Sequence, residues 1–240
     1  MGKADDSRTP LRGCFVTGTG TGVGKTVVAA AIVVRLRELG VPVRALKPLI
    51  TGLDAAPDPI WPRDHELLAR VAGATPQETI LAGYGPPVSP HLAAELAGVA
   101  PPSVDALAAG VRRAASSGSF LVVEGVGGLL VPLGPEADVR ALAAALGLAL
   151  VVVARPGLGT INHTLLTLEA AAVAGLSVAA VVLTPWPADP DAILRSNRET
   201  IARLGNVTVA TLGFIAAPEP AVLGAAAAGL ELERWLAVDS

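Results

Sequence analysis

Cysteine and aromatic residues are scarce in this chain of 240 residues. It has a single cysteine, Cys14, so no internal disulfide can form, and only 3% of its residues are aromatic. Cys14 stands among apolar neighbours that would raise its pKa, which predicts a core thiol in a reducing compartment rather than a catalytic one. Alanine, valine, leucine and glycine dominate instead, a composition that favours helices packed tightly on both faces of a parallel sheet.

An excess of positive charge is also missing. The formal net charge is -3, so we expect no basic surface and no nucleic-acid partner.

The mean hydropathy of +0.57 is high. The longest uncharged apolar run, Ala141–Ala154, is nevertheless shorter than the about 20 residues that span a membrane. Residues 1–12 are polar and show no secretory pattern, so a cytoplasmic protein without membrane association is expected.

Apolar runs typical of strands alternate with stretches typical of helices. Strands are expected at Cys14–Thr17, Val43–Leu46, Phe120–Glu124, Ala149–Ala154 and Val178–Leu183, with a weaker pattern at Val209–Phe214. Helices are expected around Val27–Leu39, Glu66–Val71, Ser103–Ala115, Val139–Leu146, Thr164–Ala174 and Asp191–Leu204. This alternation predicts one α/β domain of the P-loop NTPase type over residues 13–240, with a mainly parallel, doubly wound sheet flanked by helices. Residues 1–12 are expected to form a flexible extension, and the proline-rich stretch Asp54–Pro62 a mobile loop.

The most informative motif is the glycine-rich segment Gly18–Thr26, Gly-Thr-Gly-Thr-Gly-Val-Gly-Lys-Thr, between the first strand and the first helix. This layout is typical of a P-loop, in which backbone N–H groups and a helix N-terminus converge on a polyphosphate. Lys25 would reach the β- and γ-phosphates, and the Thr26 hydroxyl would bind Mg²⁺. An ordinary glycine-rich turn would explain the glycines but not the Lys-Thr pair. The loop is a variant, because Thr19 stands where the usual pattern has its first glycine.

Ligands of an open α/β sheet bind beyond the carboxyl ends of its strands. Lys47 follows the second strand, where it either reaches the P-loop phosphates or simply faces solvent. Glu124 closes the third strand, at the position where P-loop enzymes keep a carboxylate for Mg²⁺ or its water. Asp64 precedes a helical pattern, so it is a helix N-cap, a second Mg²⁺ ligand or both.

The three histidines and the segment Gly157–His163 are further candidates for the site. The segment Gly157–His163 opens a helix, and its free N–H groups would suit a substrate carboxylate. His65 and His163 lack partners at metal-ligand spacing, so we interpret both as structural or solvated. His91, in Ser89-Pro90-His91, could line a substrate pocket.

In this order, the motifs resemble the dethiobiotin synthetase family. The matching segments are Gly18–Thr26, Lys47–Gly52 (Lys-Pro-x-x-Thr-Gly), Glu124–Gly128 (Glu-Gly-x-Gly-Gly) and Gly159–Thr167 (Gly-x-Ile-Asn-His-x-x-Leu-Thr), with weaker likeness at Ser89–His91 and Leu212–Ile215. The resemblance covers nearly all of the chain after residue 12. The variant loop also fits, because the family has threonine where Thr19 stands.

The resemblance implies an ATP- and Mg²⁺-dependent cyclo-ligase that acts as a homodimer. Its substrates would be 7,8-diaminopelargonic acid, CO₂ or bicarbonate, and ATP or another nucleoside triphosphate, and it would release dethiobiotin, ADP and phosphate. Lys25 and Lys47 would be catalytic, and Thr26, Asp64 and Glu124 would bind the metal. The implied nucleotide-binding residues are Gly22, Val23, Gly24, Lys25, Thr26, Val27, Asp64, Glu124, Gly125, Val126, Gly127, Thr184, Pro185, Ala216, Ala217 and Pro218. The implied substrate-binding residues are Thr21 and Thr51 at the carbamate end and, from the partner subunit, Gly159, Thr160, Ile161 and Asn162 at the distal carboxylate.

Two positions depart from the family pattern. Gly22 stands where the family often has glutamate. Thr184-Pro185-Trp186 stands where the family commonly has an asparagine that recognises adenine, so relaxed base selectivity is expected. Trp186 could then stack on any base, or backbone groups near Ala216–Pro218 could recognise adenine unaided.

The alternative function is a partitioning or positioning ATPase, a P-loop switch that dimerises on ATP and binds DNA or membrane. Those proteins share the fold but place a second lysine near the start of the loop, where this chain has Gly20. The glutamine-dependent amide ligases of cobalamin synthesis have a similar loop, together with an amidotransferase domain that this sequence does not show. Both alternatives fit the motifs less well than the dethiobiotin synthetase family does.

Overall fold

A computed structural model describes residues 10–56, 58–115 and 118–236 of the chain. Most of the expected N-terminal extension lies outside these residues. In the described part of the stretch 54–62 there is no helix or strand, which agrees with the expected loop. None of the helices in the described ranges is long and apolar enough to cross a membrane.

The centre of the fold is a six-stranded sheet in which every neighbouring pair of strands is parallel. Its strands are β1 (Gly13–Gly18), β2 (Val43–Leu46), β5 (Phe120–Glu124), β8 (Ala149–Ala154), β9 (Val178–Trp186) and β10 (Val209–Gly213). They lie in the order β10-β9-β8-β1-β5-β2. All six predicted strands are therefore confirmed, as is the parallel sheet. Strand β9 is longer than predicted, because Thr184–Trp186 continues it and Trp186 pairs with Gly213.

The six predicted helices are also present. They are α1 (Lys25–Glu38), α2 (Asp64–Ala72), α5 (Val104–Ala114), α6 (Val139–Leu146), α7 (Thr160–Val173) and α8 (Ala192–Gly205). The structure adds the short pairs β3 (Leu49–Ile50) with β4 (Ala82–Gly83) and β6 (Pro132–Gly134) with β7 (Ala137–Asp138). It also adds the helices α3 (Pro76–Thr79), α4 (Pro90–Leu96), α9 (Pro220–Ala227) and α10 (Leu232–Trp235). Three of these added helices begin at a proline, a start signal that is visible in the sequence.

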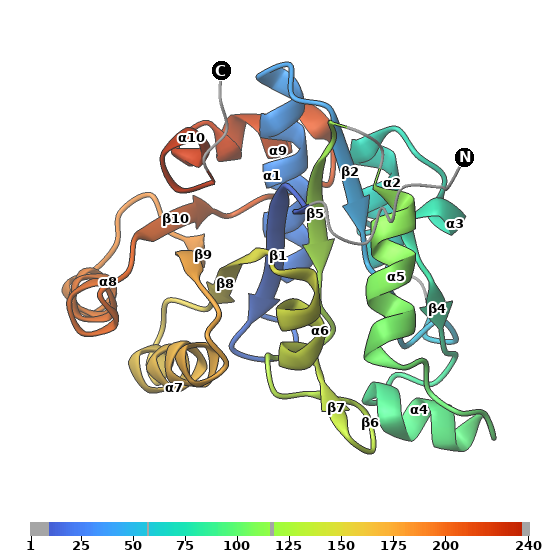
Figure 1. Cartoon of the computed structure of the whole chain (residues 1–240). Coiled ribbons are helices and arrows are strands. Elements are labelled where there is room, and N and C mark those ends of the chain that lie inside the picture. Colours follow the sequence, from blue (N-terminus) through green and yellow to red (C-terminus); the bar gives the residue numbers. More distant parts are fainter. Residues whose placement is uncertain (1–9, 57, 116–117, 237–240) are drawn as a thin grey trace.

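Helices cover both faces of the sheet, with α1 and α9 behind it in Figure 1 and α5 and α6 in front. Side chains of one strand alternate between two hydrophobic clusters, as the pleat requires. In β5, Phe120 and Val122 join the cluster formed with α1, α2 and α9, whereas Leu121 and Val123 join the cluster formed with α5 to α8. Burial on both faces explains why the strands are nearly continuous apolar runs, and it confirms the doubly wound architecture.

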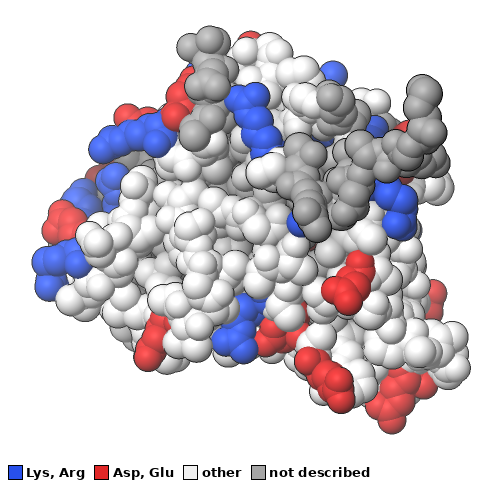
Figure 2. All heavy atoms as spheres, viewed as in Figure 1, with Lys and Arg blue, Asp and Glu red and all other residues white. Residues whose placement is uncertain are grey.

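The parallel arrangement brings the carboxyl ends of the strands to one edge of the sheet. That edge holds the start of the P-loop after β1, Lys47 after β2, Glu124 at the end of β5 and Arg155 after β8. Residues far apart in the sequence thus meet at one place. On the face shown in Figure 2, acidic and basic side chains are interspersed around a mainly uncharged centre.

Candidate functional site

Left-handed glycines shape the P-loop. Gly22 has a φ of 70° and Gly24 a φ of 98°, values that other residues adopt only with strain. A Cβ on Gly24 would also lie 2.9 Å from the Thr184 side chain, so this position lacks room for a larger residue. Gly24 is the N-cap of α1, and the helix begins at Lys25 rather than at the predicted Val27. Its first N–H groups therefore face the loop, which is the geometry of an anion site.

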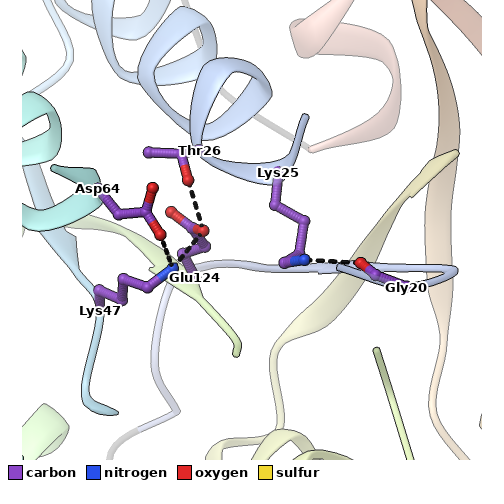
Figure 3. A network of polar contacts seen from close by, with 6 residues as sticks. All are labelled: Gly20, Lys25, Thr26, Lys47, Asp64 and Glu124. Atoms are coloured by element: carbon purple, nitrogen blue, oxygen red, sulfur yellow. Dashed lines mark hydrogen bonds and ion pairs between the residues drawn. The ribbon is translucent and has the colours of Figure 1, made fainter. Parts of the chain in front are cut away.

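Lys25 folds back over this loop. Its ammonium donates a hydrogen bond of 2.8 Å to the carbonyl oxygen of Gly20 (Figure 3). The side chain is buried, and burial lowers the pKa of Lys25, while the nearby Glu124 carboxylate opposes that change. A lysine held in this way places positive charge along the inner side of the loop.

Beside the loop, Lys47 lies between two carboxylates. Its Nζ is 2.6 Å from Asp64 Oδ2 and 2.7 Å from Glu124 Oε1 (Figure 3). The hydroxyl of Thr26 donates a hydrogen bond of 2.9 Å to the same Glu124 oxygen. Lys47 is only 3% exposed, so the alternative of a solvent-facing lysine is wrong. Asp64 is the first residue of α2, whose N-cap is Arg63, so Asp64 pairs with Lys47 rather than capping the helix.

Burial and charge act in opposite directions on these groups. Burial alone would lower the pKa of Lys47, but Glu124 and Asp64 outweigh it and raise that pKa. Burial likewise would raise the pKa of Asp64, yet the charge and hydrogen bond of Lys47 bring it below its ordinary value. For Glu124 burial dominates and Asp64 adds to it, so its pKa is raised despite Lys47. Additional positive charge beside Glu124 would therefore stabilise its ionised form.

Glu124 also has an unused oxygen. Its Oε2 is buried and has no hydrogen-bond partner among the residues that the structure describes. A buried acceptor without a partner is costly, which points to a cation or a bound water at this place. Thr26 and Asp64 supply further oxygen atoms nearby. In the described ranges no group of three or more His, Cys, Asp or Glu residues could hold a metal alone, so an ion here would keep water or phosphate ligands, as Mg²⁺ does.

Two cavities meet at the P-loop. The first cavity has a volume of about 860 Å³ and is lined by the loop, by Trp61, by residues 155–158 and by the ends of β9 and β10. The second cavity, of about 650 Å³, contains Lys25, Lys47, Asp64 and Glu124 and extends over residues 87–90. Thr21, Gly22, Gly24, Val27 and Trp61 line both cavities. The arrangement can bind a polyphosphate between them and a second molecule beside its end.

Most residues that the sequence predicted for the site lie around these cavities. Thr21, Gly22, Gly24, Lys25, Thr26, Val27, Lys47, Thr51, Asp64, Glu124, Val126 and Gly127 line the second cavity, and Val23, Thr160, Thr184 and Pro185 line the first. Within the described ranges, Gly125, Gly159, Ile161, Asn162, Ala216, Ala217 and Pro218 line neither of these two cavities. A Cβ on Gly125 would contact Phe15 and Val139, so this glycine serves close packing.

The aromatic residue of the first cavity differs from the one that the sequence suggested. Trp186 packs, partly buried, against the hydrophobic cluster of α5 to α8 and does not line the first cavity, so a stacking role for it is not supported. Trp61 and the exposed Phe214 line that cavity instead. Of the histidines, His65 is buried, His91 is exposed outside both cavities, and His163 borders the first cavity.

Arg155 is a site residue that the sequence interpretation missed. It directly follows β8, so the rule that ligands bind beyond strand ends would have pointed to it. Trp61 gave no comparable signal, because it lies in a proline-rich stretch without a periodic pattern.

A family model and curated relatives match most of the chain. A family model described as an AAA domain matches residues 12–216. The ATP-dependent dethiobiotin synthetase BioD of Mycobacterium avium is 43% identical over 226 residues, which cover 94% of this chain and 92% of that protein. The protein of the same name from Mycobacterium marinum is 43% identical over 218 residues, covering 90% and 88%. Among solved structures, chloroplast FtsY from Physcomitrella patens is similar with a TM-score of 0.49 and 16% identity, over 95% of this chain and 66% of that one.

Proposed function

This chain belongs to the dethiobiotin synthetase family, and we propose that it closes the ureido ring of dethiobiotin from 7,8-diaminopelargonic acid and CO₂. A nucleoside triphosphate would be cleaved to the diphosphate and phosphate in the same reaction. The observation that supports this proposal most strongly is the buried pair of Lys47 and Glu124, joined by the partly exposed Asp64, directly beside the P-loop residues Lys25 and Thr26. A P-loop alone would serve many nucleotide-binding proteins, whereas a buried lysine beside it suits an anionic acceptor of the phosphoryl group.

The reaction would proceed in three steps. One amine of the substrate adds to CO₂ and loses a proton, which gives a carbamate. A carbamate oxygen then attacks the γ-phosphorus, the bond to the diphosphate breaks, and a carbamic–phosphoric anhydride forms. Finally the second amine attacks the carbonyl carbon, loses a proton and expels phosphate as the ring closes. Two anions meet in the second step, so charge neutralisation is the main demand on the site.

Lys25 and Lys47 would meet this demand from opposite sides. Lys25 borders the loop that would enclose the phosphates, and Lys47 borders the second cavity, where the carbamate would lie. Glu124 and Asp64 raise the pKa of Lys47, so the lysine keeps its proton and acts as a fixed cation rather than as a base. Thr21 and Thr51 also line the second cavity and would donate to the carbamate end.

Thr26, Asp64 and Glu124 would hold Mg²⁺ together with phosphate oxygens. The unpartnered Oε2 of Glu124 supports this assignment, as do the oxygen donors around it. When bound, the ion would neutralise charge on the transferring phosphoryl group. Lys47 contacts the carboxylates of both Asp64 and Glu124 and so holds these two side chains in position.

We further propose a homodimer in which α7 of one copy faces the site of the other. The N-cap of α7 is Gly159 in a left-handed conformation, and the N–H groups after it would bind the distal carboxylate of the substrate. Beside this turn Leu158 is fully exposed, and Leu166 and Val173 on α7 are more than half exposed. Exposed apolar side chains along one helix suit burial against a second copy.

The experiment that tests the function supplies 7,8-diaminopelargonic acid, isotopically labelled bicarbonate, Mg²⁺ and ATP to the purified protein. The product is expected to be dethiobiotin that carries the label in its ureido carbonyl group, detected by mass spectrometry. Omission of any one component should abolish the product. Hydrolysis of ATP at an unchanged rate without the diamine would instead favour an ATPase switch.

A further inference from the structure

Arg155 lies over the P-loop from the neighbouring strand. It is the first residue after β8, and its guanidinium donates two hydrogen bonds to the carbonyl oxygen of Gly22, of 2.8 Å from Nη2 and 3.3 Å from Nε. The side chain is exposed and lines the first cavity together with Gly24 and Thr184. The contact thus joins two segments that both border the cavity.

The charge of Arg155 has no counterpart in that cavity. Arg155 is the only lysine or arginine among the described residues that line the first cavity, and none of those residues is Asp or Glu. No ion pair is formed by Arg155 within the ranges that the structure describes. Lys25 and Lys47 line the second cavity, which also contains Asp64 and Glu124, and Lys47 contacts both of these carboxylates. A guanidinium carries five N–H donors, so several remain for an anion in the first cavity.

The glycine at position 22 forms the turn that Arg155 contacts. Its φ of 70° favours glycine, and a Cβ here would lie 3.7 Å from Nη2 of Arg155, so the two residues are direct neighbours. The absence of a carboxylate at this position also leaves Arg155 without an acidic neighbour on the loop. Gly22 and Arg155 therefore form one structural unit, in which the cation comes from the strand next to the loop.

We propose that Arg155 binds the phosphate chain of the nucleoside triphosphate while it holds the Gly22 turn in place. The inference rests on the proposed function only in that a nucleotide binds at the P-loop. Planar guanidinium groups pair well with phosphate oxygens, and charge-assisted hydrogen bonds of this kind are stronger than neutral ones. The distal carboxylate of the diamine is the other anion that a cation in this cavity could meet, and the test below separates the two.

The test compares Arg155→Gln and Arg155→Lys with the matched control Arg198→Gln. Arg198 is likewise exposed and donates to a backbone carbonyl, that of Val209, but it lines neither of the two cavities. Binding of ATP and of inorganic tripolyphosphate is measured by calorimetry with Mg²⁺ at two salt concentrations and without the diamine. For Arg155→Gln we expect Kd to rise about tenfold for both probes and to depend less on salt. Arg155→Lys should keep the salt dependence, and Arg198→Gln should match the unmodified protein.

Three results would overturn the proposal. Unchanged binding of both probes by Arg155→Gln would exclude a phosphate contact. Weaker binding with an unaltered salt dependence, together with a lower melting temperature of the free protein, would leave Arg155 only as a support for the loop. A rise in KM for the diamine alone, with normal ATP binding, would assign Arg155 to the carboxylate. Because binding of ATP and tripolyphosphate is measured without turnover, the first two results are independent of whether dethiobiotin is formed, and only the third requires turnover.

Discussion

The ammonium of Lys47 lies 2.7 Å from Oε1 of Glu124, and both side chains are almost completely buried at the carboxyl edge of the sheet. With Asp64 on the other side of the lysine, the three groups carry one negative charge in excess. Lys47 and Glu124 are buried while Asp64 is partly exposed, so the excess charge on the buried side needs further positive charge or hydrogen bonds nearby. These contacts support the proposal of a cation at Glu124 and of anionic ligands beside Lys25 and Lys47.

Replacement of Lys47 by alanine should lower turnover by at least about 10²-fold, because a fixed cation is lost from the transition state. The fold should persist, but the free energy of unfolding should fall by roughly 3 kcal/mol in Mg²⁺-free buffer, since Glu124 loses its buried counter-charge. Initial rates and chemical denaturation measure the two effects. Lys25→Ala should give a similar loss of turnover, and near-normal turnover of Lys47→Ala would remove this residue from the proposed chemistry.

The change Glu124→Gln keeps the shape of the side chain and removes its charge. We expect the Mg²⁺ concentration for half-maximal turnover to rise by at least about tenfold, because a carboxylate is a far better Mg²⁺ ligand than an amide. Removal of the metal with EDTA should abolish turnover of the unmodified protein. Glu136→Gln at an exposed position is the control and should change nothing. An unaltered Mg²⁺ requirement would rule out Glu124 as a ligand.

The two roles considered for Asp64 are separated by Asp64→Asn and its control Asp191→Asn. Asp191 is a true N-cap, whose side chain accepts a hydrogen bond from the backbone N–H of Leu194. Asparagine caps helices as well as aspartate, so Asp191→Asn should leave both stability and activity nearly unchanged. Asp64→Asn should reduce turnover strongly while the melting temperature changes little. Full activity of Asp64→Asn would contradict a role in metal binding.

The raised pKa of Glu124 gives the Mg²⁺ affinity a pH dependence. Because the folded protein holds this proton above the ordinary value of 4.5, the contribution of Glu124 to stability is full below pH 4.5 and is lost as the pH rises through the raised pKa. Metal binding needs the ionised form, so Mg²⁺ affinity should fall as the pH is lowered into that same window. Titrations at several pH values check this, and the dependence should be weaker in Glu124→Gln. An affinity that stays constant down to pH 4.5 would contradict the assignment.

Base selectivity is expected to be low. Thr184 and Pro185 line the first cavity without a side-chain amide, and Trp61 and Phe214 offer aromatic faces that accept any base. An enzyme distinguishes bases by hydrogen bonds only where its own polar groups pair with the edge of the base. We therefore expect ATP, GTP, CTP and UTP to support turnover with comparable kcat/KM. A preference for ATP of about 10³-fold or more would show that other groups recognise adenine.

The sequence was sufficient to predict the strands, because each is a mainly apolar run, and the inner strands β1, β5 and β8 are almost completely buried. Helix starts were less predictable. Both α1 and α7 begin right after a left-handed glycine, Gly24 and Gly159, rather than after a Ser, Thr, Asp or Asn cap. The helix α9 was missed because its alanine-rich segment has no clear apolar periodicity, although Pro220 marks its start.

At the site, strand ends pointed to Lys47 and Glu124 because both follow apolar runs directly. The contact of Arg155 with Gly22 could not be predicted, since it depends on the order of strands and joins residues 133 positions apart. The burial of Lys47 also required the structure, because the sequence leaves open whether a lysine after a strand faces a ligand or water. In the structure Lys47 is buried and pairs with Asp64, so it does not face water, and its contact with a ligand stays a prediction.

The stoichiometry of turnover tests the proposed reaction most directly. Dethiobiotin and inorganic phosphate are measured in parallel while the purified protein consumes 7,8-diaminopelargonic acid, bicarbonate and ATP with Mg²⁺. We expect equal amounts of the two products, no phosphate without the diamine, and loss of both in Lys47→Ala. Phosphate release that continues without dethiobiotin, or that survives in Lys47→Ala, would contradict the proposed reaction.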